Sequence, residues 1–94
     1  QKNFGMTLKV LEYLLLLTPE EPGLWQEKGL LHYQVDHWEA ASYNLRRYFF
    51  LAGQHLLAYG HEKNRELATA TLQSHDRQIL AIFQQVEEMR RRIN

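Results

Sequence analysis

The sequence predicts an all-α fold made of antiparallel helical hairpins, about five helices in all, with the last helix acting as a C-terminal cap. Two observations predict this fold class. Apolar residues recur at three- and four-residue spacing along most of the chain, which is typical of helices with one buried face. The sequence has no sustained period-two alternation and no Asn-Gly or Asp-Gly turn, so strands are not expected.

The first predicted helix carries an apolar stripe and ends in a loop that contains two prolines. The stripe consists of Met6, Val10, Tyr13, Leu14 and Leu17. Pro19 and Pro22 end this helix. Pro22 also suits the first turn of the next helix, because its missing N–H would be unpaired there anyway. That second helix is expected over residues 22–34.

The third predicted helix follows a short turn, with Asp36 as the expected N-cap. It forms a tight antiparallel hairpin with the second helix, and its broad apolar face consists of Ala40, Ala41, Leu45, Tyr48, Phe49 and Ala52. Gly53 and Gly60 then interrupt the helical pattern and predict a short helix with a break. The final helix is expected to begin at Ser74, and its heptad-like seam consists of Ile79, Ile82, Val86, Met89 and Ile93.

An internal period connects these helices. Thr7, Leu11, Leu14 and Pro19 align with Ala41, Leu45, Tyr48 and Gly53 at an offset of 34, which is the period of the tetratricopeptide repeat. We expect the packing of the repeat to depend on small residues at the helix crossing and large ones between hairpins; the residues concerned are Trp25, Gly29, Ala41, Leu45 and Tyr48. The repeat is divergent, because Lys28, His32 and Gly53 replace its usual leucine, tyrosine and proline. The same offset places Ile79 and Ile82 opposite Leu45 and Tyr48, as part of a degenerate capping unit.

The segment from Thr7 to Leu51 resembles the C-terminal repeat region of bacterial transglutaminase-like proteins of the SirB type. The resemblance rests on three stretches, Leu16-Leu17-Thr18-Pro19, Gln26-Glu27-Lys28-Gly29-Leu30-Leu31 and Ala41-Ser42-Tyr43-Asn44-Leu45-Arg46-Arg47-Tyr48-Phe49. The family's first arginine and its aspartates are replaced here. The resemblance implies a transglutaminase-like part upstream of Gln1, whose cysteine this chain does not supply.

Length and composition exclude several classes of protein. The 94 residues suit a single domain over 1–94, and the absence of an initial methionine suggests a fragment of a longer protein. Lysine plus arginine equals aspartate plus glutamate, 11 against 11, so we expect neither nucleic-acid nor membrane binding. The chain has no cysteine, which excludes disulfides and thiolate chemistry. With no long apolar run and no signal peptide, a cytoplasmic location is expected.

No catalytic, cofactor or metal site is expected, so the chain is predicted not to be an enzyme. His32 and Asp36 share the helical spacing of metal ligands, but His37 falls past the turn and a full ligand set is missing. The adjacent carboxylate pairs Glu20–Glu21 and Glu87–Glu88 point about 100° apart on a helix, so neither pair forms a site for acid–base chemistry.

A partner-binding face is therefore the main functional candidate. The inner face of the second helix would present Gln26, Leu30, Tyr33 and Gln34. Basic residues that would clamp a peptide carboxylate are missing there, so an amphipathic or apolar segment fits better. In the alternative that we prefer, the last helix of the chain fills this groove through Ile79, Ile82, Phe83 and Val86.

Three functional hypotheses follow. The first is a non-catalytic accessory domain of a transglutaminase-like protein, which binds a protein or another domain of the same chain. The second is a homodimer formed through Ile79, Ile82, Val86 and Met89. The third and weakest is a metal- or ligand-binding domain that uses His32 and Asp36.

Overall fold

A computed structural model describes residues 3–93, and in that range the chain forms six α-helices and no strand. The predicted all-α fold is confirmed. The helices are α1 (Phe4–Leu17), α2 (Pro22–Gln34), α3 (Trp38–Leu51), α4 (His55–Tyr59), α5 (Glu62–Thr69) and α6 (Ser74–Ile93). The sixth helix arises because the segment after Gly53 forms two short helices, separated at Gly60.

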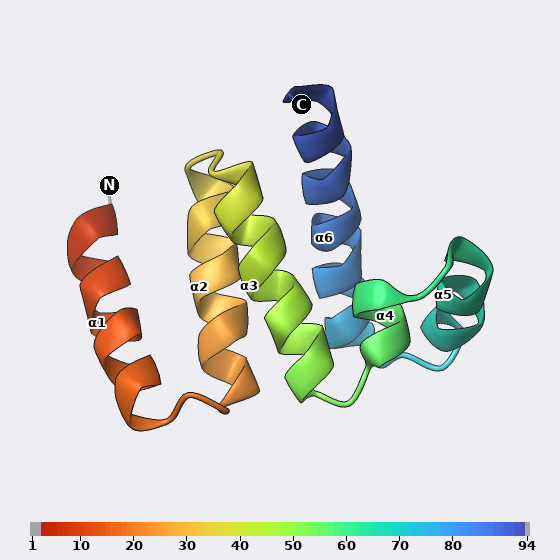
Figure 1. Cartoon of the computed structure of the whole chain (residues 1–94), viewed down its shortest axis with the longest axis horizontal. Helices are drawn as coiled ribbons and strands as arrows, with labels where there is room; N and C mark the ends of the chain where they lie inside the picture. Colours follow the sequence, from red (N-terminus) through yellow and green to blue (C-terminus); the bar gives the residue numbers. More distant parts are fainter. Residues whose placement is uncertain (1–2, 94) are drawn as a thin grey trace.

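The first three helices lie side by side and alternate in direction, and α6 lies on the far side of α3 (Figure 1). α6 runs antiparallel to α3 and in the same direction as α2. The alignment of Ile79 and Ile82 with Leu45 and Tyr48 is therefore wrong, because helices that occupy equivalent places in a repeat stack run parallel. Two short helices, rather than one, separate α3 from α6, and α6 takes the direction of a first helix of a repeat.

The face of α1 that the sequence predicts to be buried is exposed. Leu11 and Leu15 are the buried residues of α1. Most of the predicted stripe lies on the other side of the helix, since residues of an α-helix advance by about 100° each, and Leu14 lies at its edge. This set, here named the α1 stripe, is between 38% and 62% exposed and consists of Met6, Val10, Tyr13, Leu14 and Leu17.

The α2–α3 hairpin depends on a close approach of the two helices. A Cβ atom built on Gly29 would lie 2.8 Å from Cγ of Leu45, so any side chain there would force Leu45 to move. Ala41 and Leu45 are fully buried. The turn differs from the expectation, because α3 begins at Trp38 with His37 as its N-cap, and His37 makes no side-chain capping hydrogen bond. Asp36 instead adopts a left-handed conformation, with φ of 61°.

The core joins α3, α4 and α6. After α3 the chain turns at Gly53, whose φ of 80° favours glycine. The turn brings Leu57 of α4 against the core, which consists of Leu45, Tyr48, Phe49, Leu57, Ala58, Ile79, Leu80 and Phe83. Phe83 is 1% exposed, and its ring lies edge-on to that of Phe49 with 5.7 Å between centroids. α6 is thus held mainly by apolar packing.

Candidate functional site

α6 contacts the inner face of α2 through two side-chain pairs. The Tyr33 hydroxyl donates a 2.9 Å hydrogen bond to Oε1 of Gln85, and Nε2 of His75 lies 2.9 Å from Oε1 of Gln26. Leu30 packs against the core, so Gln34 is the one exposed member of the predicted partner face. The α6 residues that we expected to fill this groove are buried or partly buried; they are Ile79, Ile82, Phe83 and Val86.

This packing also affects the proposed dimer seam. Ile79 is 4% and Val86 0% exposed, while Ile82 and Met89 are partly buried. Since α6 buries these side chains within its own chain, a dimer through the same seam would require α6 to leave α3.

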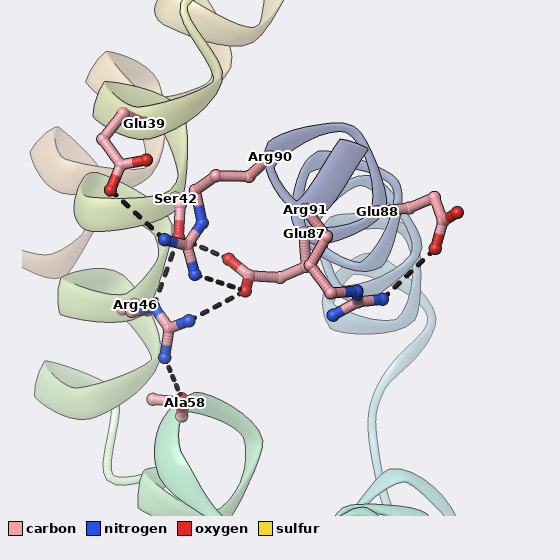
Figure 2. A network of polar contacts seen from close by, with 8 residues as sticks. All are labelled: Glu39, Ser42, Arg46, Ala58, Glu87, Glu88, Arg90 and Arg91. Carbon is pink, nitrogen blue, oxygen red and sulfur yellow. Dashed lines mark hydrogen bonds and ion pairs between the residues drawn. The ribbon is translucent and has the colours of Figure 1, made fainter. Parts of the chain in front are cut away.

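A polar network fixes α6 against α3 and α4, and its centre is the buried Glu87 (Figure 2). Oε1 of Glu87 accepts a 2.9 Å hydrogen bond from Arg46 and another from Arg90. Its second oxygen accepts from the Ser42 hydroxyl. Arg46 also donates a 2.9 Å hydrogen bond to the carbonyl oxygen of Ala58. One carboxylate therefore links three helices.

The ionised state of Glu87 in this network favours a structural role over a catalytic one. Burial alone would raise the pKa of the Glu87 carboxyl, but hydrogen bonds from Arg90 and Ser42 and the charge of Arg46 outweigh it, so the net pKa is lowered. A carboxylate with a lowered pKa binds protons weakly, which makes it a poor general acid or base near neutral pH.

A second, partly buried polar contact joins α3 to the start of α6. The Tyr48 hydroxyl donates a hydrogen bond to Asp76, which also accepts one of 3.1 Å from the Gln54 amide. Burial, together with the hydrogen bond to Asp76 and its negative charge, raises the pKa of the Tyr48 phenol. Tyr48 therefore stays protonated at every physiological pH and acts as a fixed donor.

His32 pairs with His37 and not with Asp36, so the proposed metal pair is wrong. The Nδ1 atoms of the two histidines lie 3.2 Å apart, and the Phe4 ring lies edge-on to both imidazoles. The left-handed conformation of Asp36 turns the chain so that the next residue, not Asp36 itself, meets His32. Within residues 3–93 no group of three or more potential ligands comes together around a metal position.

The histidine pair makes stability depend on pH. Burial and the neighbouring His37 lower the pKa of His32 below 6.5. The folded state therefore binds fewer protons than the unfolded state in the range just below pH 6.5, and stability falls as the pH falls through that window. We expect the free energy of unfolding, measured by urea titration, to decrease from pH 7.5 to pH 5.5 in the wild type and to change less in His32→Asn. If the free energy of unfolding changes with pH equally in the two proteins, the assignment to His32 is contradicted.

An open groove lies where the α2–α3 turn meets the end of α6. Its volume is about 570 Å³, and its lining consists of Asp36, His37, Trp38, Glu39, Ala40, Arg90 and Ile93. Arg90 bridges its two sides through a 3.2 Å ion pair with Glu39, which leaves the Asp36 carboxylate and the exposed Ile93 side chain at the rim. We name this cavity the end groove. Sequence reasoning missed it because its two halves are about fifty residues apart in the chain.

No helix within the described residues has the length and apolar character needed to cross a membrane. The chain matches the family model for the tetratricopeptide repeat over residues 1–87. No curated protein and no solved structure matches it.

Proposed function

Because the chain belongs to the tetratricopeptide repeat family, we propose that it is a non-catalytic interaction domain of a SirB-type transglutaminase-like protein. Its partner in this proposal is the transglutaminase-like part of the same polypeptide. Two observations support the proposal. The segment from Thr7 to Leu51 resembles that family, and the carboxylates of the buried Glu87 and the partly buried Asp76 serve as structural links between helices.

The end groove is our candidate for the contact surface, and the observation that carries this choice is that Tyr33 and Gln26, on the inner face of α2, already bond side chains of α6. Because Leu30 also packs against the core, a partner needs another concave surface. The end groove offers the Trp38 ring and the Ile93 side chain, next to the carboxylate of Asp36, while the carboxylate of Glu39 is paired with Arg90. An apolar side chain flanked by a lysine or arginine complements this lining.

Two measurements test the proposal. The parent gene should encode a cysteine and a histidine in a domain before Gln1, and an unrelated domain there would remove the transglutaminase-like assignment. The second measurement mixes that domain, expressed separately, with the isotope-labelled chain and follows its NMR spectrum. We expect the signals of Trp38, Glu39 and Ile93 to shift.

Replacing Trp38 should weaken this binding strongly. Aromatic anchors contribute most of the energy of many interfaces, so we expect Trp38→Ala to raise the dissociation constant by about tenfold or more. Leu67→Ala is the matched control, because Leu67 is 70% exposed on α5 and does not line the groove. Equal affinities for the two variants, or shifts confined to other surfaces, would refute the end groove as the contact.

Self-association through Ile79, Ile82, Val86 and Met89 is the rival proposal. Light scattering over a range of concentrations decides it, because a strict monomer excludes a dimer of any kind.

A further inference from the structure

A row of aromatic rings with an arginine at its centre lies on the surface formed by α2, α3 and α4. The Arg47 guanidinium lies over both the Trp25 ring and the Phe50 ring, 5.7 Å from each centroid. The Tyr43 ring stands edge-on to Trp25, and the Tyr59 ring stands edge-on to Phe50. We name this set the aromatic strip; it consists of Trp25, Tyr43, Arg47, Phe50 and Tyr59.

The strip uses a side of α3 that the core does not. Tyr43, Arg47 and Phe50 are spaced by four and three residues and so share one side of the helix. Ser42 and Phe49 contact α6 from a different side, about 100° away. The strip is therefore open to a partner while α6 stays in place.

Arg47 has no acidic partner of its own. Within residues 3–93 its guanidinium makes no hydrogen bond or ion pair, and none of its nitrogen atoms is fully buried. The neighbouring Arg46 differs, because it bonds the Glu87 carboxylate and the Ala58 carbonyl oxygen. Aromatic rings attract a cation but are not strong hydrogen-bond acceptors, so the N–H donors of Arg47 remain available to a ligand.

The rings around Arg47 are exposed and held in position. Tyr43 is 62%, Phe50 40% and Tyr59 61% exposed. Trp25 is fixed, because its indole N–H donates a 2.8 Å hydrogen bond to the carbonyl oxygen of Pro19. Arginine, tyrosine and tryptophan are the residue types that contribute most to protein interfaces. A rigid group of them on the surface indicates a binding site whose ordering cost is low.

Charge complementarity indicates an acidic ligand of the protein class. A guanidinium with open N–H donors pairs with a carboxylate through two parallel hydrogen bonds. Nucleic acid fits less well, because its binding depends on several cations that each meet a phosphate. The other cation here, Lys28, lies 5.8 Å from the Trp25 ring centroid and is already paired with Glu12 at 3.6 Å.

We propose that the aromatic strip binds an acidic segment of a partner protein. An aspartate or glutamate of that segment pairs with Arg47, and apolar side chains beside it pack on the rings of Tyr43, Phe50 and Tyr59. The strip shares no residue with the end groove, whose lining favours a partner of the opposite charge. The inference therefore does not rest on the proposed function, and either can fail alone.

A random-peptide library displayed on phage and selected on the 94-residue chain tests the proposal. We expect the selected peptides to carry an aspartate or glutamate beside an aromatic residue, a leucine or a proline. Fluorescence anisotropy of a selected peptide then measures its dissociation constant, which Arg47→Ala should raise by about tenfold or more. Arg47→Lys keeps the charge but not the two parallel donors, and should raise it by about threefold or more.

The pairing itself is tested by changing both partners. Replacing the acidic residue of the peptide by its amide should weaken binding to the wild type by about tenfold, and should have little further effect on Arg47→Ala. Tyr43→Ala provides a second test that does not depend on Arg47, because Tyr43 is largely exposed; we expect about a fivefold loss. Circular dichroism checks that each variant is folded.

Two control variants separate the strip from other surfaces. Arg92→Ala removes the same charge from the exposed end of α6, and should leave the dissociation constant of the peptide within about twofold. Trp38→Ala, in the end groove, should also leave it unchanged.

Three results would overturn the proposal. The first is a selection that yields no acidic peptide. The second is a selected peptide whose affinity is equal in the wild type and in the Arg47→Ala and Tyr43→Ala variants. The third is binding of a single-stranded oligouridine probe that is tighter than that of any selected peptide and is lost in Arg47→Ala, because the partner would then be a nucleic acid.

Discussion

Phe83→Ala is expected to lower the free energy of unfolding by about 3–5 kcal/mol, the usual cost of truncating a fully buried phenylalanine. Phe83 is 1% exposed, and its ring packs on Phe49 while the Arg46 guanidinium lies 5.4 Å from its centroid. The truncation therefore leaves a cavity between α3 and α6. Since small domains are stable by only about 5–15 kcal/mol, the loss is a large part of the total.

Urea titration measures this loss, and hydrogen exchange locates it. We expect the amides of α6 to lose more protection than those of α2, because α6 depends on Phe83 for its position. Ile93→Ala is the control on the same helix, since Ile93 is 66% exposed. If the two substitutions cost the same, α6 does not pack as described.

Glu87→Ala is expected to cost about 2–4 kcal/mol. It removes the one carboxylate that accepts hydrogen bonds from Arg46, Arg90 and Ser42. Arg46 is then left without an ion-pair partner, and Arg90 keeps only its exposed pair with Glu39. Breaking a buried ion pair costs about 3–5 kcal/mol, but the two arginine side chains are about a quarter exposed and recover some hydration. The loss should also weaken α4, because Arg46 binds the Ala58 carbonyl oxygen.

The neighbouring Glu88 provides the control for this experiment. Glu88 pairs with Arg91 and Arg92 on the exposed side of α6, where ion pairs contribute little. Glu88→Ala should therefore leave the unfolding curve almost unchanged. A Glu87 variant as stable as the Glu88 variant would mean that the network in Figure 2 does not hold α6.

The helices could be predicted from the sequence where local signals are strong. Pro22 marks the first turn of α2, Ser74 starts α6, and the glycines at 53 and 60 interrupt the chain where the structure turns. These signals act within one turn of helix, so their positions need no knowledge of the tertiary fold.

The errors concern properties that only the tertiary fold decides. The periodicity of α1 fits either of its two apolar sides, and the position of α2 selects the side of Leu11. The left-handed conformation of Asp36 brings His37 to His32, which helical spacing does not describe. The role of Glu87 was missed because two of its partners, Ser42 and Arg46, lie more than forty residues away, on α3.

Two contacts define the fold: Gly29 lies against Leu45 in the α2–α3 hairpin, and α6 packs on the far side of α3. A NOESY spectrum of the folded chain tests both contacts at once. We predict cross-peaks between the Gly29 α-protons and the Leu45 methyl groups, and between the Phe49 and Phe83 rings. A well-folded chain without the Gly29–Leu45 cross-peaks would contradict the account.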